Sequence, residues 1–264
     1  MSHALHVEVT DATAIVRLER PEKRNALSFE LMRELVATAR QLRRDRALRA
    51  VILCGAGPSF CAGLDVAELG NGGNRGFVFK ELLKPSRSLF QQVALAWRDL
   101  PVPVIAAVHG DCIGGGLQLA LGADIRIATP DSRWSILEGR WGLVPDMGLT
   151  TTLRGVVRAD VAKELTMTAR MFDGEHAHAI GLVTKLSEQP LASAQAWAKE
   201  LAMRSPDAVL GGKRLIDAMA HAGHRRALWM EKWWQLKLLL GRNSAIARRR
   251  AKTPELPWRT RQFE

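Results

Sequence analysis

The chain of 264 residues has no tyrosine, only three cysteines and no long apolar run. A membrane-spanning helix needs about 18 or more consecutive apolar residues, so we expect no membrane span. Cys54, Cys61 and Cys112 are odd in number and follow no metal-ligand spacing, which argues against a disulfide framework and predicts a reduced, cytoplasmic setting. The first residues lack a basic stretch followed by an apolar one, so we expect no secretory signal there.

Motifs of several enzyme classes are also missing. The chain contains no G-x-S-x-G, no Walker A sequence and no H-E-x-x-H, which argues against a serine hydrolase, a phosphate loop of that type and a zinc protease. His176 and His178 lie two residues apart on an expected helix, a poor spacing for one metal ion. We therefore expect no metal site.

The formal net charge is +11. Such a charge favours anionic partners, for example nucleic acid, an acidic membrane surface or a phosphorylated metabolite. Much of it lies in residues 33–49 and 242–261, and the second segment contains Arg248-Arg249-Arg250. Both segments are equally compatible with solvated helix faces. No aromatic stripe typical of single-strand binding accompanies them, so nucleic-acid binding is the rival interpretation rather than the main one.

The segment from Val104 to Ala123 carries the most specific pattern. A β-branched apolar run predicts a buried strand, and Gly114, Gly115 and Gly116 then precede a segment with helical character. A strand that leads through glycines into a helix directs unpaired backbone N–H groups at one point. The pattern predicts a site for a phosphate, or for an oxygen that becomes negative during a reaction. The alternative is a tight turn packed against a neighbouring segment.

Strand and helix patterns alternate over the first half of the chain, which indicates an α/β fold. Ser28 is placed to cap a helix over residues 29–43. Residues 69–76 are rich in glycine and predict a flexible insertion, and a single helix is expected over 81–98. Strands are expected at residues 6–9, 14–18, 51–53, 104–108, 125–128, 133–137 and 182–186.

The last third is mostly helical, with helical periodicity over 161–168, 191–204, 206–220 and 225–240. Trp229 and Trp233 are four residues apart and share a helix face, so we expect a core or a subunit contact there. These patterns divide the chain into a core of residues 1–195 and a helical C-terminal oligomerisation region of residues 196–264.

Several segments together resemble the enoyl-CoA hydratase/isomerase family, also called the crotonase family. They are SFCAGLDV at 59–66, IGGGLQLALGADIRIA at 113–128, RPEKRNAL at 20–27, VPVIAAVHG at 102–110 and GLVP at 142–145. They occur in the family's order and at its spacings, over nearly the whole chain. The resemblance implies a crotonase-like spiral of β-β-α units with a helical C-terminal region. It also implies a homotrimer or a dimer of trimers joined through the C-terminal helices.

Members of this family act on acyl-CoA thioesters, whose carbonyl oxygen becomes enolate-like during the reaction. The resemblance implies that the backbone N–H groups of Leu64 and Gly115 hold that oxygen, as donors that need no reorganisation. Coenzyme A is part of the substrate, and no separate cofactor is implied. The resemblance also implies which residues bind the substrate and its CoA moiety. Lys23 and Arg24 are assigned to the phosphates, and Gly114 to the glycine turn. The adenine and pantetheine path is assigned to Ala26, Ala62, Asp65 and Val66.

The catalytic carboxylates depart from those of the family's hydratases, which use two glutamates to orient and activate one water. The first corresponds here to Gln118, on the same helix face as Gly115. An amide orients water by hydrogen bonds but cannot act as a base. The second corresponds to Glu138, to which the resemblance assigns the proton transfer. The alternative for Glu138 is a strand-end glutamate in a salt bridge.

Asp146 is the second acidic candidate. Dienoyl-CoA isomerases of the family carry a catalytic aspartate at this offset of eight residues from the matching glutamate, and the alternative is an N-cap for a helix from about Leu149. We therefore expect an enoyl-CoA hydratase/isomerase with Glu138 as the acid/base group. Because Gln118 replaces the first glutamate, a double-bond isomerase rather than a hydratase is one alternative. A non-catalytic member of the fold that binds an anionic ligand or nucleic acid is another.

Overall fold

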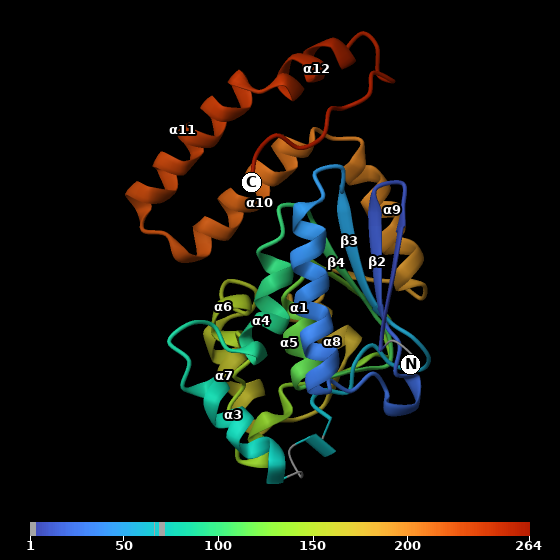
Figure 1. Ribbon diagram of the computed structural model, residues 1–264, viewed down its shortest axis with the longest axis vertical. Coiled ribbons are helices and arrows are strands. Elements are labelled where there is room, and N and C mark those ends of the chain that lie inside the picture. The colour runs from blue at the N-terminus through green and yellow to red at the C-terminus, as the bar shows by residue number, and fades with distance from the viewer. Residues whose placement is uncertain (1–3, 66, 69–71) are drawn as a thin grey trace.

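The computed structural model describes residues 4–65, 67, 68 and 72–264 (Figure 1). Val66, which the resemblance assigns to the CoA path, and residues 69–71 of the expected insertion lie outside the described residues. Within the described part, the strands form a six-stranded sheet in the order β1-β2-β3-β4-β6-β9 and a three-stranded sheet in the order β5-β7-β8.

The larger sheet begins with an antiparallel pair and continues with parallel neighbours. Its strands are β1 (Leu5–Thr10), β2 (Thr13–Leu18), β3 (Ala50–Gly55), β4 (Val104–Val108), β6 (Ile125–Ala128) and β9 (Lys185–Leu186). The smaller sheet contains β5 (Asp111–Ile113), β7 (Arg133–Ser135) and β8 (Phe172–Asp173). The expected α/β class is confirmed.

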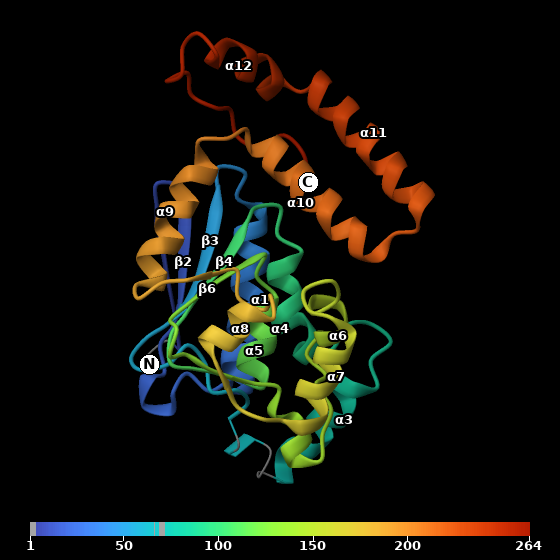
Figure 2. The ribbon, with the colours of Figure 1, turned by 180° about the vertical axis from the view of Figure 1, so that it is seen from behind.

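Helices cover both faces of the larger sheet and continue beyond it (Figures 1 and 2). The α-helices are α1 (Phe29–Arg44), α3 (Arg75–Leu82), α4 (Leu89–Arg98), α5 (Gly115–Leu121), α6 (Leu149–Thr152), α7 (Ala159–Thr168), α8 (Gly174–Ala179), α9 (Pro190–Ala202), α10 (Pro206–His221), α11 (His224–Leu240) and α12 (Arg242–Arg250). The described residues also form three short 3₁₀ helices, η1 (Pro21–Lys23), η2 (Gly72–Asn74) and η3 (Leu137–Trp141).

The alternation of side chains along β3 explains why the sheet is covered on both faces. Successive residues of a strand point to opposite faces. Val51 and Leu53 belong to the large apolar cluster that includes the buried face of α1. Ile52 and Cys54 belong to a second cluster with Ala194 and Ala198 of α9. A strand buried on both sides reads as a continuous apolar run, which is how β3 appears in the sequence.

The N-cap expected at Ser28 is confirmed, because its side chain accepts a hydrogen bond from the Leu31 N–H at 3.2 Å. The single helix expected over 81–98 is wrong. The chain forms α3 and α4 instead, separated by a segment that contains Pro85. Ser88 and Gln91 form a reciprocal capping box that starts α4. The described end of the expected insertion is also helical, as η2 and the start of α3.

Helices α10, α11 and α12 form an arm that extends from the body (Figures 1 and 2). The rings of Trp229 and Trp233 stack with centroids 5.7 Å apart, and they are 58% and 43% exposed in the single chain. A core position for this pair is therefore wrong, and a subunit contact stays a prediction. Trp234 is buried instead and packs edge-on against Phe263.

The division of the chain at residue 195 also stays a prediction. Helix α9 crosses this position and packs on the sheet, and the arm begins after it, at Pro206. In the described part of the chain, every helix is too short or too polar to cross a bilayer.

Candidate active site

The glycine turn joins β5 to α5 and carries the first part of the site. Gly114 has a φ of 52°, a left-handed conformation that favours glycine, and Gly115 is the first residue of α5. Gly116 lies against the loop of residues 59–65: a Cβ on it would come within 2.2 Å of the Cys61 carbonyl oxygen. Close packing against a neighbour therefore applies to Gly116, and the N–H of Gly115 is left without a helical partner because it starts the helix.

The backbone N–H of Leu64 lies beside that of Gly115. A Cβ built on Gly115 would lie 3.6 Å from the Leu64 nitrogen. Leu27 holds Leu64 in place through a parallel bridge, in which the Leu27 N–H donates to the Gly63 carbonyl at 2.7 Å. Among the described residues, neither the Leu64 nor the Gly115 N–H donates a hydrogen bond outside the regular elements. Two free donors thus meet where the sequence predicts them.

Gln118 and Glu138 form a hydrogen-bonded pair next to this turn. The Nε2 of Gln118, on the fully buried face of α5, donates to Oε1 of Glu138 at 2.6 Å. The Oε1 of Gln118 accepts the Met147 N–H at 2.9 Å. A Cβ on Gly114 would lie 3.4 Å from the same Glu138 oxygen, so the carboxylate is adjacent to the glycine turn.

The other oxygen of Glu138, Oε2, is buried and has no hydrogen-bond partner in the described part of the chain. Glu138 lies in η3, three residues beyond the end of β7, and takes part in no ion pair between described residues. The salt-bridge alternative is therefore wrong. A buried carboxylate oxygen without a partner is costly when it is charged, so Oε2 is suited to carry a proton or to meet a ligand.

Burial is the main cause that raises the pKa of Glu138 above its ordinary value. The hydrogen bond from Gln118 lowers this pKa, and the nearby charge of Asp146 raises it. The pKa of Asp146 is also raised by desolvation, although its side chain is exposed at the surface of the single chain. Glu138 is therefore the better candidate for the acid/base group, because its free oxygen is enclosed.

The N-cap alternative for Asp146 is wrong. Helix α6 begins at Leu149, and its N-cap is Gly148, which has a φ of 91°. The aspartate instead contributes its charge to the environment of Glu138. The two acids, eight residues apart in the chain, therefore belong to one electrostatic environment.

The segment at residues 20–27 and the loop at residues 59–65 are fastened together by polar contacts that sequence reasoning missed. Arg20 forms an ion pair with Asp65 at 2.9 Å and also donates to the Ala26 carbonyl. Buried Asn25, with a φ of 56°, donates to the carbonyls of Ala56 and Ser59 at 2.9 and 2.7 Å. Asparagine tolerates this backbone conformation and bonds to nearby backbone groups. An asparagine at position 25 is therefore the sequence signal that could have indicated these hydrogen bonds.

The basic candidates lie on the rim of the same region. Lys23 ends η1 and is exposed, and the Arg24 side chain is 63% exposed, with one contact to Asp111 at 3.3 Å. The Arg24 carbonyl accepts the Ala62 N–H at 2.9 Å. This bond ties the basic segment to the loop that carries the Leu64 donor, so five sequence-predicted residues, Lys23, Arg24, Ala26, Ala62 and Asp65, share one neighbourhood.

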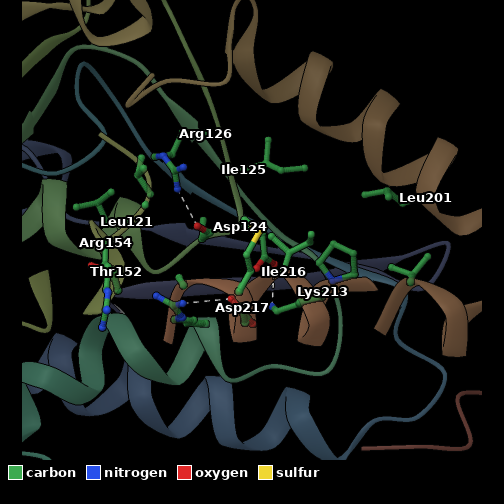
Figure 3. A pocket seen from close by; sticks show the side chains of 18 residues that line it. Leu121, Asp124, Ile125, Arg126, Thr152, Arg154, Leu201, Lys213, Ile216 and Asp217 are labelled. Atoms are coloured by element: carbon green, nitrogen blue, oxygen red, sulfur yellow. Dashed lines mark hydrogen bonds and ion pairs between the residues drawn. The ribbon is translucent and has the colours of Figure 1, made fainter. Parts of the chain in front are cut away.

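A large cavity lies elsewhere in the described part of the chain. It has a volume of about 510 Å³ and lies between the sheet edge and α10 (Figure 3). Its polar lining includes the Lys213–Asp124 ion pair at 2.7 Å, and Asp124 also accepts the Val104 N–H. No candidate site residue within the described ranges lines this cavity. These charged groups fasten α10 to the sheet, and the candidate chemistry lies at the glycine turn.

Comparisons with known proteins identify the class of protein. The sequence profile described as enoyl-CoA hydratase/isomerase matches residues 8–235. The mitochondrial Δ(3,5)-Δ(2,4)-dienoyl-CoA isomerase of Mus musculus is 34% identical over 250 residues, which cover 88% of this chain and 71% of the relative.

Solved structures agree with this match. An enoyl-CoA hydratase from Bacillus anthracis superposes with a TM-score of 0.88 at 27% identity, over 98% of this chain and 100% of that one. A Thermobifida fusca protein solved in complex with CoA gives a TM-score of 0.81 at 28% identity, over 90% of this chain and 93% of that one.

The fold and the profile match define a crotonase-fold protein. The chain belongs to the enoyl-CoA hydratase/isomerase family. The predicted fold, the family resemblance and an enzyme activity on acyl-CoA thioesters are thereby confirmed. The comparisons do not favour the nucleic-acid-binding interpretation.

Proposed function

We propose that this enzyme stabilises an enolate-like thioester oxygen with the backbone N–H groups of Leu64 and Gly115, and that Glu138 moves the proton. One observation carries the proposal: two free N–H donors lie next to a carboxylate that has a buried, unpartnered oxygen. Positioned backbone donors stabilise charge as it develops, without reorganisation.

The raised pKa of Glu138 supports its role as acid and base. A carboxylate whose pKa lies closer to neutral accepts a proton more readily than an exposed one and returns it later in the reaction. The proton leaves the carbon next to the thioester carbonyl, and the electron pair delocalises onto the oxygen held by the two donors. The enzyme thus needs one enclosed carboxylate and two backbone dipoles for this step.

We assign the CoA moiety to the rim formed by Lys23 and Arg24, with Ala26, Ala62, Asp65 and Gly114 along the path to the turn. The exposure of both basic side chains supports this assignment, because their charges are available to phosphates. The Thermobifida fusca structure in complex with CoA supports binding of CoA by this fold. Asp65 acts indirectly, because its carboxylate is occupied by Arg20.

A homotrimer, or a dimer of trimers, is proposed through the arm of α10–α12. The exposed, stacked pair of Trp229 and Trp233 supports a contact there, since large apolar patches on a single chain mark interaction surfaces. A cytoplasmic location is proposed because Cys54, Cys61 and Cys112 are all free and buried.

A second candidate, isomerisation of a dienoyl-CoA, is favoured by Asp146. Its charge raises the pKa of Glu138, and a second acid at one site is suited to return a proton at a carbon other than the one that loses it. The 34% identity to the mouse dienoyl-CoA isomerase supports this candidate.

The test is mass spectrometry of a 3-enoyl-CoA, a 2-enoyl-CoA and a 3,5-dienoyl-CoA incubated with the enzyme in heavy water. A shifted double bond with no gain of water identifies an isomerase, with or without deuterium uptake, and the substrate that shifts fastest separates the two candidates. Addition of water to the 2-enoyl-CoA identifies a hydratase. No shift of a double bond and no addition of water with any of the three, with the CoA ester still bound, overturns the assignment of Glu138.

A further inference from the structure

Both polar atoms of the Gln118 side-chain amide are hydrogen-bonded, and these two bonds determine the orientation of the amide. The Met147 backbone offers only an N–H at this point, so it requires an acceptor, which is Oε1 of Gln118. The Nε2 group must then face Glu138. If the amide were rotated by 180°, a donor would face the Met147 N–H and an oxygen would face the carboxylate. Both contacts would become repulsive, so hydrogen-bond chemistry fixes the orientation that the structure shows.

The orientation of Gln118 makes the two oxygens of Glu138 unequal. Oε1 accepts a hydrogen bond whichever protonation state the carboxyl adopts, so it is unsuited to hold the proton. Oε2 is buried without a partner. We infer that Gln118 is a positioning residue that assigns the proton to Oε2 of Glu138, so that this site moves a double bond within an acyl-CoA rather than adding water to one. The inference rests on the proposed function and specifies its reaction.

The reaction balances with Oε2 alone. In a 3-enoyl thioester, the Cα–H bond breaks, its proton goes to Oε2, and its electron pair forms a dienolate whose oxygen the two backbone donors hold. The Oε2–H bond then breaks and the proton bonds to Cγ. The thioester carbonyl re-forms, the double bond lies between Cα and Cβ, and Glu138 is again a carboxylate. No water or oxidant is consumed.

Addition of water requires more than this pair offers. A water must be held and deprotonated at Cβ while a second proton is delivered to Cα. Gln118 has no proton to exchange, and its carbonyl oxygen is occupied by Met147. Glu138 has one oxygen occupied by Gln118. The pair is therefore equipped for one proton that leaves and returns, which is the requirement of isomerisation.

The test compares Gln118→Met and Gln118→Glu with the parent chain. Methionine keeps the volume but removes both hydrogen bonds. We expect its kcat for a 3-enoyl-CoA to fall roughly 100-fold, because a misplaced catalytic group loses about this much. We also expect the acid limb of kcat to move to higher pH, because the lost hydrogen bond lowers the pKa of Glu138. A merely structural loss would lower kcat without moving the limb.

Glutamate at position 118 supplies the independent readout. As a neutral acid its O–H replaces the amide as donor to Oε1 of Glu138, and once ionised it repels that oxygen. We expect Gln118→Glu to keep isomerase activity at low pH. As the pH rises and the new carboxyl ionises, isomerase activity should fall, which adds an alkaline limb to the pH profile of kcat. The variant should also gain the ability to add water to a 2-enoyl-CoA. Gln195→Met is the matched control, because Gln195 lies exposed on α9, and it should leave both rates unchanged.

Three results would overturn the inference. One is a parent enzyme that adds water to a 2-enoyl-CoA as fast as it shifts a 3-enoyl-CoA. Another is a folded Gln118→Met variant with unchanged kcat and an unmoved acid limb. The third is a Gln118→Glu variant without the alkaline limb. If the parent chain binds the CoA ester but neither shifts a double bond nor adds water, the proposed function itself fails, and this outcome is distinct from the other three.

Discussion

Replacing Gly115 with alanine tests the oxyanion site directly. The new Cβ would lie 2.9 Å from the Met147 sulfur, 3.3 Å from Leu27 Cδ1 and 3.6 Å from the Leu64 nitrogen. The first two are the ends of flexible side chains and can move aside. The third is a backbone donor, and the methyl group would occupy the space in front of it, where we propose that the thioester oxygen binds.

The magnitude follows from the loss of that donor. Removing one oxyanion-hole donor costs on the order of 100- to 1,000-fold in kcat, or about 2.7–4 kcal/mol of transition-state stabilisation. The folded state should not be weakened to the same extent, because alanine is favoured over glycine within a helix by roughly 0.5–1 kcal/mol. We therefore expect a large fall in kcat with little change in the thermal midpoint.

The assay is steady-state kinetics on the substrate identified by the heavy-water experiment, together with thermal denaturation. Gly212→Ala is the matched control, because Gly212 also lies within a helix and a Cβ there would meet nothing within 4 Å. It should keep the kcat of the parent chain. If folded Gly115→Ala has the same kcat as this control, the N–H groups of Leu64 and Gly115 do not hold the reacting oxygen.

Three further predictions concern the acids and the ion pair. Glu138→Gln should lower kcat by about 100-fold or more while calorimetry finds the affinity for a CoA thioester unchanged, and a parallel loss of affinity would contradict the catalytic role. Asp146→Asn removes a negative charge that raises the pKa of Glu138. That pKa should fall, and because the base must be ionised, the acid limb of kcat/KM should move to lower pH; an unmoved limb would refute the coupling. Asp65→Asn removes the partly buried ion pair with Arg20. It should cost about 1–2 kcal/mol in chemical denaturation and raise KM, and unchanged values would show that the loop is held by its other bonds.

The fold could be predicted because its signals are local and repeated. Continuous apolar runs marked the buried strands, and Ser28 marked the start of α1. The single helix expected over 81–98 is wrong because Pro85 and the capping box of Ser88 and Gln91 separate two helices there. Both signals, Pro85 and the Ser-x-x-Gln spacing of residues 88–91, are present in the sequence.

The candidate site was predictable residue by residue, but its hydrogen bonds were not. Gln118 and Glu138 are 20 residues apart, and their contact depends on how α5 and η3 pack. The acceptor role of Gln118 depends on the Met147 N–H, which any residue other than proline at that position would supply. The helix-cap alternative for Asp146 failed because Gly148, which adopts a positive φ, is the N-cap of α6. Such conformations are set by tertiary contacts.

The stacked tryptophans on the arm allow assembly of this protein to be followed by its intrinsic fluorescence. The chain lacks tyrosine, so its near-ultraviolet emission comes from indole with no transfer from phenol rings. Trp97 and Trp134 are fully enclosed in the body and should emit alike whether or not chains associate. Trp229 and Trp233 meet solvent in the single chain. Trp141 in η3 is also exposed, so the measurement uses a Trp141→Phe variant; a shift of its emission to shorter wavelength on raising the protein concentration would report the arm, and its midpoint would give the strength of assembly without a label.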